Sequence, residues 1–418
     1  MMNIVKKTKR FQWTMQDSIW MMGVYGATVG AGTLFLPVEV GARGPQIFIL
    51  LLILGLPLSL LPHVLICRVL MRDSDARDQT LPMFGGFFGS KGRELVKLFF
   101  CIAHYPVTLV YAVSLVNAFT HLLTVRLHIP GVNRWSLTLV VLSLLHLVLL
   151  KGRDRVVKTM SMLALPFAAA LLLVAIWQIP DWNVSNLSDA WLQTPPSGGS
   201  LRLTDIWLTL PLISFSLCCA PLIPALASWY GEPHAGGEKQ AVRVVRLAYA
   251  LIFISITFFV LSCILSMPAK VFIAAKSNNL NVLSVIGGEH SLLFWIAPFI
   301  AIIGMSKSFL GISMPVAETF SALSASVVNH QSAGGLKRIK TAIVAIMFCT
   351  TTGVVWANPD VINLIETVCG PLIAVFLFLI PSYLIFRRRE LKPLRNIAAF
   401  ISLMSGIATL TALIFLML

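Results

Sequence analysis

The stretch "YGATVGAGTLFLP", residues 25–37, lies inside the first long apolar run of the chain and holds three glycines within its first eight residues. Each glycine in a helix interior costs about 1 kcal/mol relative to alanine. A helix that crosses a membrane would therefore carry weak helix formers near its middle. Two interpretations are open. Gly26 and Gly30 form the G-x-x-x-G pattern of a helix-packing face, or the glycines mark an unwound segment that lines a binding site.

The composition of the chain indicates a membrane protein. Of its 418 residues, 57% are hydrophobic and 12% are charged, whereas soluble domains carry about 25% charged residues. Apolar stretches recur from end to end, and about 20 apolar residues are enough to cross the hydrocarbon core as a helix. The sequence holds no polar stretch long enough for a separate soluble domain. We therefore expect a single all-α polytopic membrane domain over residues 1–418.

The apolar runs predict eleven transmembrane helices after a short N-terminal segment, residues 1–15. They lie near residues 16–37, 46–68, 95–124, 135–150, 159–179, 205–229, 247–267, 291–325, 341–356, 361–386 and 395–418.

The net charge of +15 is explained by membrane topology, and we expect no nucleic-acid partner. With the N-terminus inside the cell, 25 of the 32 Lys and Arg residues fall in cytoplasmic segments or at the adjacent helix ends. The other seven are Lys307, within a span, and Arg43, Arg126, Arg134, Arg202, Lys270 and Lys276, on the opposite side. Because Lys and Arg gather in cytoplasmic loops, this distribution predicts a cytoplasmic N-terminus and a C-terminus on the outer side.

The eleven helices divide into two groups of five and a final helix, residues 395–418. Each group has an odd number of spans, so two repeats, residues 16–179 and 205–386, would have opposite orientations, as in many secondary transporters. The first helix of the second group contains "LPLISFSLCCAPLIPAL", residues 210–226, with three prolines, which interrupt helical hydrogen bonding. This matching weakness favours an inverted repeat with broken first and sixth helices.

Four stretches of the sequence resemble one known family. They are "WMMGVYGATVGAGTLFLPVEVG" (20–41), "YPVTLVYAVSLVN" (105–117), "KSFLG" (307–311) and "IETVCGPLIA" (365–374). The chain resembles the bacterial hydroxy and aromatic amino acid permeases over nearly its whole length. The resemblance implies the five-plus-five inverted-repeat fold of the amino acid–polyamine–cation superfamily. It also implies amino acid uptake by symport, usually with protons, across the bacterial inner membrane, with a periplasmic C-terminus.

The sequence departs from this family where the substrate side chain would be recognised. Serine-type members tend to have S-F-N-H-S-P in the sixth helix, whereas this chain has "SLCCAP" at residues 216–221. After "KSFLG" the family often continues H-Y-L-G, whereas this chain reads "ISMP" at residues 312–315. The choice between a serine- or threonine-like and an aromatic amino acid therefore stays open.

An amino acid is a zwitterion, so its site needs donors for the carboxylate and acceptors for the ammonium. Unwinding near Gly30 would expose backbone N–H groups at the start of a half-helix, whose positive end suits a carboxylate. Hydroxyls and carbonyls on both broken helices would complete the site. Tyr111 is either a carboxylate donor or a packed aromatic. The candidate substrate-binding residues are Thr28, Gly30, Ala31, Gly32, Thr33, Tyr111, Ser214, Phe215, Ser216, Cys218 and Cys219.

Ionisable residues inside spans are costly and often functional. Lys307 lies about sixteen residues into the eighth helix, with Ser308 beside it and Glu318 three turns later on the same face. Glu366 lies in the tenth helix. A lysine near the middle of the membrane can take the place that a sodium ion has in ion-coupled relatives, and can exchange a proton. We expect Lys307 or Glu366 to couple transport to protons; the alternative is a purely structural ion pair.

The cysteines and histidines in the spans do not indicate a metal site, and we expect no cofactor. The seven cysteines lie in or at the edges of spans without metal-ligand spacing. His63, His104 and His146 lie on three different spans without an i, i+4 partner, so we expect no metal site. Asp17 is expected to cap the first helix.

Three other classes of function fit the sequence less well. A membrane-embedded enzyme needs a catalytic set such as G-x-S-x-G, H-E-x-x-H or paired membrane aspartates, and the sequence holds none of these. A transporter-like sensor would need an added domain. A channel fits one broken helix per half less well than alternating access does. The sequence therefore predicts a proton-coupled amino acid importer that is not an enzyme; its oligomeric state is left open.

Overall fold

The computed structural model describes residues 13–72, 84–187, 203–232, 236–288, 291–328 and 333–417. The predicted cytoplasmic N-terminus falls mostly on residues 1–12, which lie outside the described residues. The longer helices are α1 (Met15–Thr28), α2 (Ala31–Arg43), α3 (Pro45–Leu70), α4 (Ser90–His121), α5 (Arg134–Leu150), α6 (Arg153–Trp177), α8 (Leu203–Ser216), α9 (Ile223–Gly231), α10 (Gly237–Ser266), α11 (Ala269–Ser277), α13 (Leu292–Val328), α14 (Ala333–Ala357), α17 (Ile380–Arg387) and α18 (Ile397–Met417). The short helices are α12 (Val282–Val285), α15 (Val361–Leu364) and α16 (Gly370–Ala374).

The described helices identify an all-helical membrane protein. Eight of them are long and apolar enough to cross a membrane, and the bent pair formed by α1 and α2 makes a ninth when it is counted as one span. Two shorter apolar helices, Arg134–Leu150 and Ile397–Ala412, lie where the sequence predicts two further spans. Three π-helical turns interrupt the regular helices: η2 (Leu122–Arg126), η5 (Ile365–Cys369) and η6 (Val375–Leu379).

The first apolar run forms two helices and not one. α1 ends at Thr28, α2 begins at Ala31, and the two are bent by 51°. The sequence predicts that this helix ends near Pro37, but Pro37 lies inside α2, which continues to Arg43. Pro37 is the seventh residue of α2, so the helix continues past it without the hydrogen bond that an N–H at this position would donate to the carbonyl of Thr33. Membrane helices tolerate such a proline where neighbouring groups satisfy the freed carbonyl.

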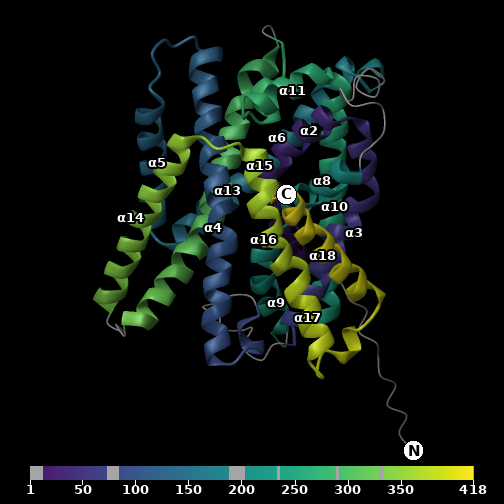
Figure 1. Cartoon of the computed structure of the whole chain (residues 1–418), viewed down its shortest axis with the longest axis vertical. Helices are drawn as coiled ribbons and strands as arrows, with labels where there is room; N and C mark the ends of the chain where they lie inside the picture. The colour runs from purple at the N-terminus through teal and green to yellow at the C-terminus, as the bar shows by residue number, and fades with distance from the viewer. Residues whose placement is uncertain are drawn as a thin grey trace, which may run out of the picture.

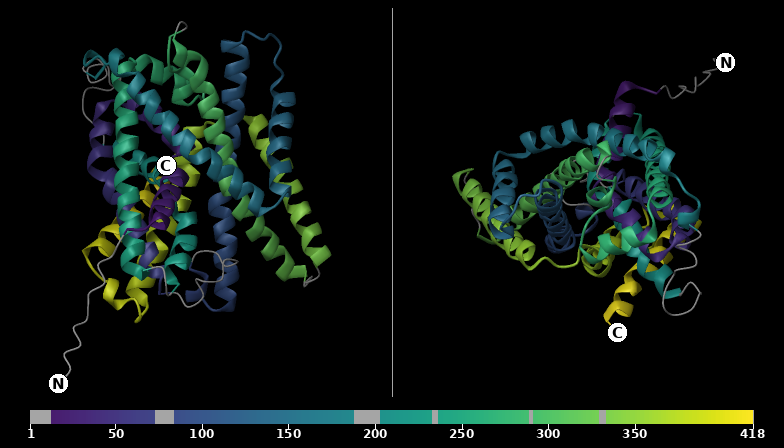
Figure 2. Two further views of the ribbon diagram at one scale, coloured as in Figure 1. Left: turned by 180° about the vertical axis from the view of Figure 1, so that it is seen from behind. Right: turned by 90° about the horizontal axis from the view of Figure 1, so that it is seen from above.

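The helices form a bundle with two helices at one edge. α5 and α14 pack side by side at one edge, where they contact α4 and α13 (Figures 1 and 2). α13 also packs along α6, and α1 packs against α6 and α10. α2 and α11 lie near one end of the bundle, whereas α9 and α17 lie near the other (Figure 1). α2 packs against α8, so the two interrupted segments, α1–α2 and α8–α9, lie beside each other in the bundle.

Candidate functional site

A lysine from another helix forms hydrogen bonds to the backbone at the interruption between α1 and α2. Val29 and Gly30 are extended, so the last carbonyl groups of α1 have no partner within the helix. The ammonium of Lys307, on α13, donates to the carbonyl oxygen of Gly26 at 2.5 Å and to that of Val29 at 3.0 Å. Lys307 is 2% exposed. A buried positive charge thus lies at the negative end of a helix dipole, where it is stabilised.

The second interruption lies beside the first. α8 ends at Ser216, residues 217–219 are not helical, and a 3-10 turn at Ala220–Leu222 leads into α9. The Ser216 hydroxyl donates to the carbonyl oxygen of Gly32 at 3.0 Å. The Thr28 hydroxyl donates to the Val24 carbonyl and also interacts with the Cys219 thiol. The structure therefore brings the candidate residues of both broken helices together.

The glycines of the first interruption allow three close approaches. A Cβ on Gly26 would lie 2.7 Å from Cβ of Ala164 on α6, so this glycine packs as the G-x-x-x-G interpretation expects. A Cβ on Gly30 would lie 2.7 Å from the hydroxyl oxygen of Ser308. A Cβ on Gly32 would lie 2.9 Å from Cα of Ser216. The last two glycines allow the interruption to pack closely against α13 and α8.

Two buried hydroxyl groups remain without a partner near these interruptions. Thr33, in the first turn of α2, and Ser214, on α8, are 0% and 2% exposed. Within the described parts of the chain, neither hydroxyl oxygen has a hydrogen-bond partner. A buried polar group without a partner costs about 1–3 kcal/mol. These two hydroxyls are therefore suited to bind a polar molecule. Ala31 begins α2 between Gly30 and Gly32.

Aromatic and sulfur-containing side chains lie on the α8 side of the site. The Tyr111 ring, on α4, lies 6.3 Å from the Phe215 ring, measured between centroids and tilted by 51°. Phe215 and Cys219 are buried, and Cys218 is half-buried. These candidate residues form a mixed apolar and polar group around the second interruption.

A network of charged side chains lies at the α2 and α11 end of the bundle. Arg43 donates to Glu366 at 3.1 Å and to the hydroxyl of Thr209 at 2.9 Å. Glu39 pairs with Arg43 and, at 2.8 Å, with Lys276 on α11. Glu366 lies in the π-helical turn η5, and such turns are frequent at functional sites. The network links four segments of the chain: α2, α8, α11 and η5.

Glu366 stands out in the sequence as an ionisable residue within a span, but the sequence does not indicate its partners. Glu39 and Arg43 lie beyond the predicted end of the first span, although their i, i+4 spacing is that of a helical ion pair. Glu318 is half-buried on α13. Eleven residues of helix extend about 16 Å, so Glu318 is too far along α13 for direct contact with Lys307. Ser308, by contrast, lies against Gly30.

Asp17 lies at the N3 position of α1, whose N-cap is Thr14 and not Asp17 as the sequence predicts. Together with Thr14 it makes a capping box. Its carboxylate also accepts hydrogen bonds from the Tyr230 hydroxyl at 2.5 Å and from the Gln240 amide at 2.9 Å. These contacts tie α1 to the end of α9 and the start of α10, at the opposite end of the bundle from α11 (Figure 1).

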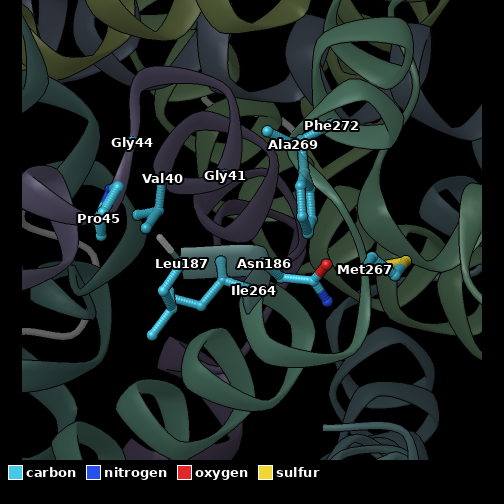
Figure 3. Close-up of a pocket in the computed structure, with 10 residues that line it drawn as sticks. All are labelled: Val40, Gly41, Gly44, Pro45, Asn186, Leu187, Ile264, Met267, Ala269 and Phe272. Carbon is cyan, nitrogen blue, oxygen red and sulfur yellow. The ribbon is translucent and has the colours of Figure 1, made fainter. Parts of the chain in front are cut away.

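A pocket lies beside α2, away from the interruptions. Figure 3 shows its lining, which comprises Val40, Gly41, Gly44, Pro45, Asn186, Leu187, Ile264, Met267, Ala269 and Phe272. None of the candidate substrate-binding or coupling residues lines this pocket. Among the described residues, no group of three or more His, Cys, Asp or Glu side chains is placed to hold a metal ion. All seven cysteines are free thiols.

Solved structures with a similar fold cover almost the whole chain. The structure of MhsT in complex with L-phenylalanine covers 98% of this chain and 99% of its own, with a TM-score of 0.57 and 14% identity. A manganese transporter from Eremococcus coleocola, crystallised with an aromatic bis-isothiourea substituted compound, covers 97% of this chain and 87% of its own, with a TM-score of 0.57 and 13% identity. At this level of identity the likeness shows a shared fold.

Sequence relatives extend over almost the whole chain. The serine transporter SdaC of Escherichia coli (strain K12) is 31% identical over 389 residues, which are 91% of this chain and 90% of that protein. The inner membrane transport protein YqeG of the same strain is 29% identical over 412 residues, or 96% and 99%. The threonine/serine transporter TdcC of Yersinia enterocolitica is 28% identical over 407 residues, or 92% and 91%.

No family model matches the sequence. The resemblance that the four sequence stretches indicated is nevertheless confirmed by these full-length relatives. They show an inner-membrane, multi-pass protein of the same transporter class. The chain therefore belongs to the hydroxy and aromatic amino acid permease family, and it is a membrane transporter for amino acids rather than an enzyme.

Proposed function

We propose that this chain imports a serine- or threonine-like or an aromatic amino acid across the bacterial inner membrane by proton symport and alternating access. The observation that carries the proposal is the Lys307 ammonium on the carbonyl groups at the end of α1. Relatives named as serine and threonine/serine transporters support the substrate class. The replacement of the family's amide and imidazole by Cys218 and Cys219 leaves the side-chain preference to experiment.

The proposed architecture has eleven spans. Residues 16–179 and 205–386 form two inverted repeats, and residues 395–418 add the last helix. In support, the first span of each half is interrupted, α1–α2 in one and α8–α9 in the other. The basic end of α17 and the start of α10 place Lys and Arg residues at one end of the bundle. That end is assigned to the cytoplasm, with a cytoplasmic N-terminus and a periplasmic C-terminus.

The substrate is proposed to bind between the two interruptions. Its carboxylate would accept hydrogen bonds from the free N–H groups in the first turn of α2, near Gly30, Ala31 and Gly32, and from the hydroxyl of Thr33. Its ammonium would donate hydrogen bonds to the Ser214 hydroxyl and to backbone carbonyls close to Ser216. The side chain of the amino acid would face Tyr111, Phe215 and Cys218, with Thr28 and Cys219 supporting the backbone. The unpartnered hydroxyls of Thr33 and Ser214 favour this arrangement.

Proton coupling is assigned to Lys307, with Ser308 beside it. Its ammonium bridges two backbone carbonyls, as a bound metal cation does in ion-coupled transporters with broken helices. Release of the proton would remove the positive charge from the end of α1 and loosen its contact with α13. Glu366, held by Arg43, is the second candidate for this role, and Glu318 the third.

A substrate screen tests the proposal. The purified protein is screened against the common L-amino acids by thermal stability, and each amino acid that raises the melting temperature is tested for counterflow in liposomes. We expect one amino acid, or a small group of related ones, to be exchanged. A protein that is stabilised by an amino acid but exchanges none would be a sensor, and the importer proposal would be rejected.

A further inference from the structure

Three buried histidines have the same local geometry. They lie on α3, α4 and α5, and in each the ring nitrogen Nδ1 lies close to the carbonyl oxygen four residues earlier. The distances are 2.6 Å for His63, 2.9 Å for His104 and 2.8 Å for His146. A bond of this kind satisfies a polar side chain within its own helix. By itself it assigns no role to any of the three residues.

His63 differs from the other two because its second ring nitrogen reaches the broken helix. The backbone N–H of Cys219 donates to Nε2 of His63 at 3.1 Å. A backbone N–H can only donate, and the carbonyl oxygen of Ser59 can only accept. The ring is therefore neutral, with its hydrogen on Nδ1 and its lone pair on Nε2. No other protonation state satisfies both contacts.

Tyr249, on α10, acts on the same segment. Its ring lies 4.5 Å from the His63 ring, and its hydroxyl donates to the carbonyl oxygen of Leu217 at 3.1 Å. His63 and Tyr249 thus satisfy a backbone donor and a backbone acceptor that the end of α8 leaves without helical partners. In a membrane-buried segment such groups are costly when unpaired, so these two side chains allow the interruption at Leu217–Cys219 to exist.

We propose that His63 is a positioning residue of the substrate site, because its neutral imidazole fixes the backbone of the α8–α9 interruption at Cys219. This inference rests on the proposed function of that interruption in substrate binding. The segment also carries Ser216, whose hydroxyl holds Gly32. A shift at Cys219 therefore changes the spacing between the two broken helices, and with it the affinity for substrate. His63 itself does not touch the substrate.

Substitution of His63 by Gln or by Asn tests its two hydrogen bonds separately. In His63→Gln the amide oxygen extends to the position of Nε2 and can accept from Cys219. In His63→Asn the shorter amide reaches only the position of Nδ1, close to Ser59. The matched controls are His146→Gln and His146→Asn, because Nε2 of His146 has no partner among the described residues. Tyr249→Phe removes the donor to Leu217 and serves as an independent variant.

The readouts are the KM and maximal rate of uptake in liposomes, and hydrogen exchange of peptides that contain Cys219. We expect His63→Asn to raise KM about tenfold, the effect of losing one buried hydrogen bond, with a smaller change in maximal rate. His63→Gln should stay within about threefold of the wild type by the same measure. Tyr249→Phe should raise KM as well, and the two His146 variants should match each other. Amide exchange at Cys219 should be faster in His63→Asn than in His63→Gln.

Equal KM values and equal exchange in the two His63 variants would overturn the inference. A loss of maximal rate and of folded protein at unchanged KM would also overturn it, since that is the result of a purely structural role. If the wild-type protein transports no amino acid, the proposed function fails, and the exchange measurement alone then decides whether His63 holds the segment. The inference and the proposed function can therefore fail separately.

Discussion

The ammonium nitrogen of Lys307 lies 3.0 Å from the carbonyl oxygen of Val29, at the point where α1 gives way to α2. One side chain of α13 therefore satisfies backbone groups that the interruption exposes, and it brings a positive charge to the negative end of a half-helix. The ring of Phe167 lies 5.1 Å from the same nitrogen, which adds a favourable cation–π contact. Removing the ammonium should change both the stability of the interruption and its response to protons.

Uptake by the Lys307→Ala variant should no longer depend on the proton gradient. The variant keeps the residues proposed to bind substrate, so counterflow should continue, but the group that exchanges the proton is gone. Uptake with and without an inward proton gradient gives the measurement. Lys270→Ala, at an exposed position on α11, is the matched control and should behave like the wild type. Accumulation by Lys307→Ala that still follows the gradient would reject the role of Lys307.

Glu366→Gln should keep its dependence on the proton gradient and lose stability. The change replaces the carboxylate beside the Arg43 guanidinium by a neutral amide. Because Arg43 keeps its ion pair with Glu39, the cost should be that of one hydrogen bond to a charged group, about 1.5–3 kcal/mol. Thermal unfolding in detergent measures the cost, and the uptake assay measures coupling. A Glu366→Gln protein that ignores the gradient, beside a Lys307→Ala protein that follows it, would assign coupling to Glu366 instead.

Gly32→Ala should weaken or abolish transport. An added Cβ would lie 2.9 Å from a backbone atom of Ser216 and 3.0 Å from the Phe215 ring, so α2 and α8 must move apart at the site. Gly353→Ala, on α14 where an added Cβ meets nothing within 4 Å, should leave transport intact and stabilise the helix by up to about 1 kcal/mol. Equal uptake by the two variants would contradict a close approach at Gly32.

The sequence alone was sufficient to predict that the first helix is weak. Glycines in an apolar run lower helix propensity wherever they occur, so the interruption near Gly30 was predictable. The sequence could not show which neighbours fill the space that the glycines leave. Ala164, Ser308 and Ser216 lie more than a hundred residues away in the chain, and only the packed bundle brings them to Gly26, Gly30 and Gly32.

The partners of the buried charges could not be predicted from the sequence. Lys307 stood out because a lysine inside a span is costly, but its acceptors are backbone carbonyls, which every residue carries. The pairing of Glu366 with Arg43 joins positions 323 residues apart. Nothing in the sequence indicates the contact of His63 with Cys219, because no local pattern shows that a histidine will accept a hydrogen bond from a distant backbone amide.

Asp17→Asn should destabilise the end of the bundle formed by α1, α9 and α10. The carboxylate of Asp17 completes a capping box and accepts from both Tyr230 and Gln240. Loss of the charged acceptor weakens the capping box and the hydrogen bonds from Tyr230 and Gln240, which should cost about 1–3 kcal/mol. The measurement is the melting temperature in detergent. Asp181→Asn, at an exposed position after α6, is the control, and an equal shift in both variants would rule out this role for Asp17.

The most direct test of the account is gradient-driven accumulation by the wild-type protein. Liposomes that contain the protein receive an inward proton gradient and the labelled amino acid that the screen identifies, with a protonophore as the control. We predict that the amino acid accumulates above its external concentration and that the protonophore abolishes this accumulation. Uptake that only reaches equilibrium, or accumulation that the protonophore leaves unchanged, would contradict proton symport through the Lys307 site.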